Sequence, residues 1–82
     1  MGDAKWQETF DGYERRTHEG ETVIVMHVYY VGILEKGWSV SAVFQQTAGA
    51  HRRGRAKTFR AAKAAAERAA PHVLAGARRA GR

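Results

Sequence analysis

The segment Thr22–Val31 constrains the fold of this chain more than any other, because it is almost wholly apolar on both of its alternating faces. Its β-branched and aromatic residues are typical of a strand. The two faces are Val23, Val25, His27, Tyr29 and Val31 on one side, and Ile24, Met26, Val28 and Tyr30 on the other. Successive side chains of a strand point to opposite sides of a sheet, so we expect Thr22–Val31 to be a central strand that is buried on both sides.

Two more strands are predicted beside this one. Tyr13–His18 forms a short, largely polar strand that leads into Thr22–Val31 through a hairpin turn, in which Gly20 can adopt a positive φ. After a turn at Gly32–Gly37, Trp38–Gln46 alternates apolar and polar residues, which predicts a strand with one buried face. That buried face is Trp38, Val40, Ala42 and Phe44. The three segments together predict a three-stranded antiparallel meander.

The last part of the chain predicts one helix, with an apolar stripe at spacings of three and four residues. The stripe is Phe59, Ala62, Ala66, Ala69, Ala70, Val73, Leu74 and Ala77. Thr58 occupies the N-cap position. Pro71 has no amide hydrogen and clashes with the preceding turn, so we expect the helix to kink or break between Glu67 and His72.

With 82 residues, the chain has room for a single domain. We expect an α+β fold over residues 1–82, in which the three-stranded antiparallel sheet carries the C-terminal helix on one face. The ends, 1–5 and 78–82, are expected to be flexible, since terminal residues stay loose unless something holds them. Trp6 and Phe10 lie four positions apart, which predicts either a helical turn or a lid over the face that the helix leaves open.

Composition excludes several classes of protein. The chain contains no cysteine, so it has no disulfide framework and no thiolate metal site, and we expect a cytoplasmic protein. The apolar run Val23–Leu34 is 12 residues long, too short to span a bilayer, so we expect no membrane association. The four histidines are scattered along the sequence, which predicts neither a metal site nor a cofactor. The serines and carboxylates lie in no catalytic motif, so we do not expect an enzyme or a small-molecule substrate.

Charge is distributed very unevenly along the chain. Residues 1–50 contain four cations and seven acids, a net charge of −3, whereas residues 51–82 contain ten cations and one acid, a net charge of +9. Thr47–Lys57 is small, glycine-bearing and basic, which predicts a loop that leads into the helix. The cations of this loop and of the following helical turns are Arg52, Arg53, Arg55, Lys57, Arg60 and Lys63. Since amides at a helix N-terminus attract anions, these cations predict a phosphate-binding site; the alternative is a solvated loop that serves solubility.

The stretch Gly54–Ala66 (Gly-Arg-Ala-Lys-Thr-Phe-Arg-Ala-Ala-Lys-Ala-Ala-Ala) resembles the start of the last helix of double-stranded RNA-binding domains, where a glycine-bearing loop precedes a basic motif and an alanine-rich helix. The resemblance implies that Arg60 and Lys63 contact phosphates, while Phe59 stands where the family has a basic residue. The first helix of that family and its histidine-bearing hairpin are missing from this sequence. A three-stranded sheet with a C-terminal helix is also similar to the arm-type DNA-binding domains of integrases, which implies a phage or mobile-element origin.

Together, these features predict a non-catalytic protein that binds the phosphate backbone of DNA or RNA, with a duplex favoured. Tyr29 or Tyr30, whichever lies on the open face of the sheet, is the candidate for a contact with a base or a protein partner. The alternative function is a small adaptor or inhibitor module that dimerises through its open sheet face. We expect a homodimer, since one helix can cover only one face of the central strand.

Overall fold

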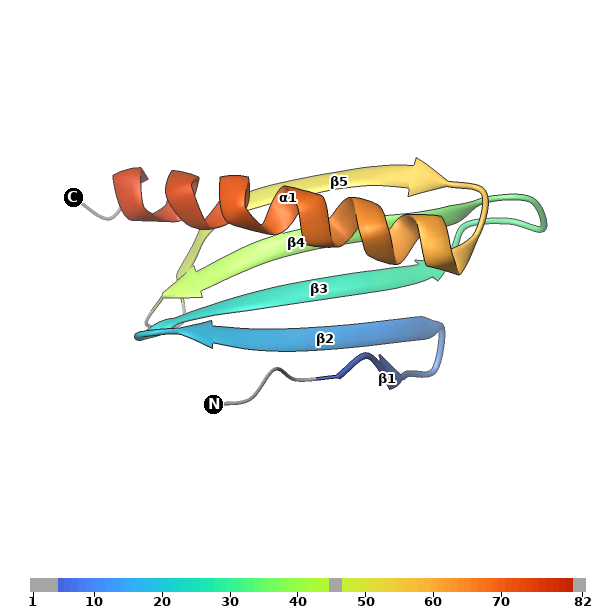
Figure 1. Ribbon diagram of the computed structural model, residues 1–82, viewed down its shortest axis with the longest axis horizontal. Coiled ribbons are helices and arrows are strands. Elements are labelled where there is room, and N and C mark those ends of the chain that lie inside the picture. The colour runs from blue at the N-terminus through green and yellow to red at the C-terminus, as the bar shows by residue number, and fades with distance from the viewer. Residues whose placement is uncertain (1–4, 45–46, 81–82) are drawn as a thin grey trace.

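Residues 5–44 and 47–80 are described by the computed structural model, in which five strands form one open antiparallel sheet and one helix lies across a single face (Figure 1). The elements are β1 (Gln7–Glu8), β2 (Gly12–Glu19), β3 (Thr22–Tyr30), β4 (Lys36–Phe44), β5 (Thr47–Ala56) and α1 (Phe59–Ala80). Each strand pairs with the next one in chain order, so the sheet is a meander with β3 at its centre. The α+β class, the central strand and the C-terminal helix are confirmed, whereas the expected number of three strands is wrong.

The hairpin between β2 and β3 has the turn that the sequence predicts. Glu19 pairs with Thr22, so the loop contains only Gly20 and Glu21. Gly20 has a φ of 63°, a left-handed conformation that a residue with a Cβ adopts only with strain. This tight turn sets the register of β2 against β3.

β5 forms where the sequence predicts a basic loop over Thr47–Lys57, so that prediction is wrong for all of these residues except Lys57. The strand pairs with β4 over the whole length of β4, and therefore satisfies backbone groups that would otherwise lie at an open edge. One extra residue, Gly49, forms a β-bulge opposite Ala42 and Val43. The small residues that suggested a loop instead allow β5 to lie close to the rest of the fold: Gly54 leaves room for the indole of Trp38.

β1 and the residue before it replace the lid that was expected over the open face. β1 pairs with the first residues of β2. Strand alternation turns Trp6 toward the helix, where it packs against the core, and its Nε1 donates a hydrogen bond to Glu67 Oε2 at 3.1 Å. Phe10 is fully exposed. The helical turn and the lid predicted for this segment are therefore both wrong.

The core lies between α1 and the face of β3 and β4 that the helix covers. Its buried residues are Ile24, Met26, Val28, Val40, Ala42, Ala62, Ala66, Ala69 and Val73. Alanines predominate on the helix side of this core, which allows α1 to lie close to the sheet. The inward register of Trp38, Val40 and Ala42 is confirmed, whereas the side chain of Phe44 lies outside the described part of the structure.

The second face of β3 is only half-buried, because the helix covers the other side of the sheet (Figure 1). The expected burial of this strand on both sides is therefore wrong. We call the face of the sheet opposite α1 the open face. On β3 it consists of Val23, Val25, His27 and Tyr29.

The helix begins at the predicted N-cap and passes through Pro71 without a break. Thr58 Oγ1 accepts a hydrogen bond from the amide of Ala61 at 3.1 Å, which confirms the cap. Pro71 and Glu67 lie on the exposed side of the helix, so the Glu67 carbonyl that lacks an amide partner can bond to water instead. The predicted break of the helix is therefore wrong.

The flexibility expected for the chain ends, 1–5 and 78–82, stays a prediction. Residues 78–80 belong to α1. Residues 1–4 and 81–82 lie outside the described residues, as do residues 45–46 at the predicted end of the third strand. Within the described chain, α1 lacks the apolar length that a membrane-crossing helix needs.

Candidate functional site

Three of the predicted phosphate-binding cations lie on the edge strand β5. Arg53 and Arg55 alternate with Gly54, which lies against Trp38 on the helix side, so both arginines point to the open face. Arg52 lies on the helix side of the same strand. All three arginines are exposed to solvent.

The turn after β5 adds two more cations. Lys57 lies in this turn and Arg60 in the first turn of α1, and both are exposed. The first turn of α1 contains no acidic residue. The structure therefore brings five of the six predicted cations to one edge of the sheet and its adjoining turn, and we call them the basic edge: Arg52, Arg53, Arg55, Lys57 and Arg60.

The arginines of the open face form a regular row. Side chains on one face of a strand repeat every two residues, about 6.6 Å apart, so Arg53 and Arg55 stand near the spacing of successive phosphates in a nucleic-acid strand. Arg55 Nη1 donates to Glu35 Oε2 at 3.1 Å, in an exposed ion pair that contributes little to stability. Within the described residues, Arg55 is the only member of the basic edge that forms an ion pair.

Lys63, the sixth predicted cation, lies apart from the basic edge. Its Nζ is 3.8 Å from the centroid of the Tyr13 ring on β2 and 5.6 Å from that of Trp6. β2 is three strands away from β5. The alanine-rich helix thus presents Arg60 and Lys63 to different surroundings, and Lys63 acts as a cation over aromatic rings.

The two candidate tyrosines lie on opposite faces of the sheet. Tyr30 is on the helix side, where its ring meets Phe59 edge to face with centroids 4.8 Å apart, and the Nζ of Lys36 lies 5.3 Å from its centroid. Tyr29 is on the open face and lies across Gly37 of β4. Tyr29 is therefore the tyrosine on the open face, which is the position expected for a contact with a base or a protein partner.

His27 is the neighbour of Tyr29 on the open face, and a loop residue holds it. Its Nε2 lies 3.0 Å from Oδ1 of Asp11, and its ring centroid is 5.1 Å from that of Tyr29. The hydrogen bond with His27 keeps the pKa of Asp11 below its ordinary value. Asp11 also accepts the amide of Tyr30 through its backbone carbonyl at 3.1 Å, so this loop fixes the end of β3. The sequence places Asp11 only in a turn, and its partner becomes visible only once β2 and β3 are paired.

A hollow of about 520 Å³ lies between the end of β3 and β5. Its size falls in the range of small-molecule sites, about 300–1,000 Å³. The residues that line it are Tyr29, Tyr30, Val31, Arg53, Gly54 and Arg55. Two tyrosines and two arginines therefore line the same space, a combination that suits stacking and anion binding.

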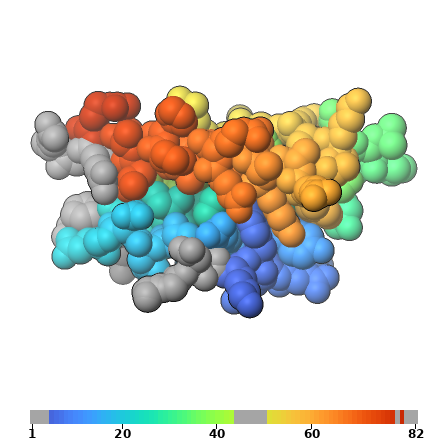
Figure 2. Space-filling model, viewed as in Figure 1, coloured from blue at the N-terminus to red at the C-terminus, as the bar shows by residue number. Residues whose placement is uncertain are grey.

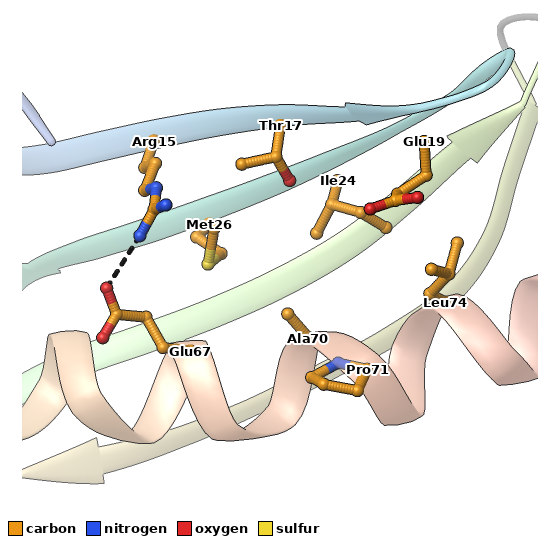
Figure 3. Close-up of a pocket in the computed structure, with 9 residues that line it drawn as sticks. All are labelled: Arg15, Thr17, Glu19, Ile24, Met26, Glu67, Ala70, Pro71 and Leu74. Carbon is orange, nitrogen blue, oxygen red and sulfur yellow. Dashed lines mark hydrogen bonds and ion pairs between the residues drawn. The ribbon is translucent and has the colours of Figure 1, made fainter. Parts of the chain in front are cut away.

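A second hollow, of about 350 Å³, lies on the helix side between α1 and β2 (Figure 3). Ile24 and Met26 form its apolar floor. At one end Arg15 Nη1 donates to Glu67 Oε2 at 2.8 Å, while Arg15 Nε is buried without a hydrogen-bond partner in the described structure. This hollow opens where α1 leaves β2 uncovered, and it contains none of the predicted site residues.

The uneven charge of the sequence becomes a separation of charge across the sheet. Because strand order follows chain order, the acidic first half supplies β1 and β2 and the basic second half supplies β5 at the opposite edge. The acids of the first two strands and their turns are Glu8, Asp11, Glu14, Glu19 and Glu21. A polyanion would therefore be drawn to the β5 side of the molecule.

Metal-ligating side chains do not converge in groups of three or more anywhere in residues 5–44 and 47–80.

Comparison of the chain with known protein families, with curated proteins and with solved structures finds no match. Its function must therefore be argued from the fold and the site themselves.

Proposed function

We propose that this protein binds nucleic acid, contacting the phosphate backbone through the basic edge. The observation that supports the proposal most directly is the pair Arg53 and Arg55, exposed side by side on one face of an edge strand. Guanidinium groups bind phosphate in a bidentate manner, and their spacing on the strand matches successive phosphates.

The surroundings of this pair support the same function. Arg52, Lys57 and Arg60 extend the positive surface around the edge of the sheet and onto the start of α1. The acids lie mainly at the opposite edge, so the field of the protein would orient a polyanion toward β5. The proposed function is binding without catalysis, in the cytoplasm.

The salt dependence of binding tests this function. A fluorescent oligonucleotide should lose affinity steeply as salt increases, because bound cations release counterions from the phosphates. Arg53→Gln/Arg55→Gln should weaken binding and reduce the logarithmic salt slope by about 0.7 to 0.9 for each lost contact. The matched control is Arg68→Gln, which removes an exposed cation from α1 outside the basic edge. Equal affinity and slope in the wild type and the double variant would contradict the proposal.

Self-association is a second candidate, as part of an adaptor or inhibitor module. Ile33 is 95% exposed and Leu34 is 80% exposed in the loop between β3 and β4, which projects at one end of the molecule (Figure 2). Along its outer side, β5 has no partner strand in the described structure. Exposed apolar residues and open edges are features by which small proteins form homodimers.

Light scattering at micromolar concentration tests this second candidate. A homodimer would have twice the chain mass of 9.1 kDa, and Ile33→Ser/Leu34→Ser should return it to the monomer if the loop forms the interface. Charged substitution at Val25 tests the open face in the same way. A mass near 9.1 kDa for the wild type would exclude the homodimer.

A further inference from the structure

The strip of the open face that lies over β4, between the side chains of β3 and β5, is called the trough below. Its floor is made of small residues, because β4 presents Gly37, Ser39 and Ser41 to this side. β3 and β5 flank it, and two strand spacings separate them by about 9.6 Å. Within this strip the ring of Tyr29 lies over Gly37, whereas Ser39 and Ser41 remain partly exposed.

The two walls of the trough differ in chemistry, and the strand register sets them opposite each other. Tyr29 and Arg55 stand on either side of Gly37. One step along, His27 and Arg53 stand on either side of Ser39. Each crossing of the trough thus pairs an aromatic ring on β3 with a guanidinium group on β5. In a nucleotide, the base and its phosphate are likewise separated by the sugar. One nucleotide can therefore place its base on a ring of β3 and its phosphate on a guanidinium group of β5.

The aromatic wall is held in place before any ligand binds. A Cβ on Gly37 would lie 2.5 Å from Cε2 and 2.6 Å from Cζ of Tyr29, so the ring rests directly on the glycine backbone. His27 is fixed by its hydrogen bond to Asp11. The rings of His27 and Tyr29 are tilted by 38° and remain half-exposed. Rings that are already ordered lose little conformational entropy when a base stacks on them.

We propose that the ligand of the open face is single-stranded nucleic acid, with bases stacked on Tyr29 and His27 and phosphates bound to Arg53 and Arg55. This inference rests on the proposed function and names its substrate class. In a duplex the bases are already paired and stacked inside the helix, so they cannot stack on Tyr29 or His27. Base stacking combined with a basic groove is the usual means by which sheets bind single strands.

The first experiment compares wild-type binding to a labelled single strand of about 12 nucleotides, to the same strand in a duplex, and to an abasic strand with the same phosphates. The single strand should bind at least tenfold more tightly than either of the other two. Equal affinity for all three would overturn the single-strand inference and leave phosphate binding intact. Binding to none of them would instead contradict the proposed function.

The second experiment uses variants of Tyr29. Tyr29→Leu should reduce single-strand affinity by about 5- to 150-fold, the loss expected for one stacked base, and leave duplex affinity unchanged. Tyr29→Phe keeps the ring and should bind like the wild type. Circular dichroism verifies that both variants fold. Equal loss of single-strand and duplex affinity in folded Tyr29→Leu would overturn the inference. The abasic strand tests base stacking independently, because it is measured with the wild-type protein.

Discussion

The indole of Trp38 lies across Gly54, the residue directly opposite it on β5. The ring covers the backbone of β5 at Gly54, which has no side chain of its own. Tyr29 covers Gly37 in the same way on the other face of the sheet. Cross-strand pairs of an aromatic residue and a glycine protect the ladder from water, and here they hold the basic edge strand to the sheet.

Substitution of Gly54 by alanine should therefore destabilise the protein. The new Cβ would lie 2.6 Å from Cζ2 of Trp38, so the indole must move, at a cost of about 1–3 kcal/mol in the free energy of unfolding. Urea unfolding measures this cost, and tryptophan fluorescence reports the displaced ring. Gly32→Ala is the matched control, because a Cβ at that position meets no atom within 4 Å. Equal stability of the two variants would show that Trp38 does not depend on Gly54.

Pro71→Ala should stabilise the fold, because α1 is already helical through this position. The variant restores an amide donor to the Glu67 carbonyl and removes a residue that costs about 3 kcal/mol inside a helix. Proline also restricts the unfolded chain, which offsets about 1 kcal/mol of this gain. A net increase of about 1–2 kcal/mol in the free energy of unfolding is expected from urea titration. His72→Ala, next to it on the exposed surface, serves as the control, and a less stable Pro71→Ala would show that the proline is needed to shape the helix.

Acidification should weaken the loop that holds His27. The hydrogen bond lowers the pKa of Asp11, so the folded state favours the carboxylate more than the unfolded chain does. Its contribution is present above the ordinary aspartate pKa and is lost as the pH falls below about 4, toward the pKa of the folded state. Wild-type stability should therefore fall more steeply over this range than that of Asp11→Asn. A titration followed by NMR should show the Asp11 pKa returning toward its ordinary value in His27→Gln, and an unchanged Asp11 pKa would contradict the assignment.

Lys63 should matter for stability and not for phosphate binding. Its ammonium group lies over Tyr13, and Lys63→Gln should cost about 0.5–1 kcal/mol in the free energy of unfolding. Oligonucleotide affinity should remain within twofold of the wild type, whereas Lys57→Gln on the basic edge should reduce it and leave stability unchanged. The reverse pattern would assign Lys63 to the nucleic-acid site.

Local sequence patterns predicted the parts of this fold that depend on neighbouring residues. The period-two pattern of Thr22–Val31 and Trp38–Gln46 predicted β3, β4 and the inward register of Val40 and Ala42. Thr58 predicted the start of α1, which its hydrogen bond confirms. The same patterns missed β5, although cations alternate with small residues from Arg53 to Ala56. That alternation was the available signal, and the glycines and the charge run obscured it.

The sequence by itself determined the α+β class, the order of the central elements, the capped helix and the charge asymmetry, because these follow from periodicity and composition within short windows. Only the tertiary structure decided that Thr47–Ala56 is a strand, since its conformation depends on backbone hydrogen bonds to β4. It also separated Lys63 from the basic edge and decided that Tyr29, and not Tyr30, lies on the face away from the helix. The candidate site joins residues of β3 and β5 across β4, and that arrangement exists only once the strands have paired in register.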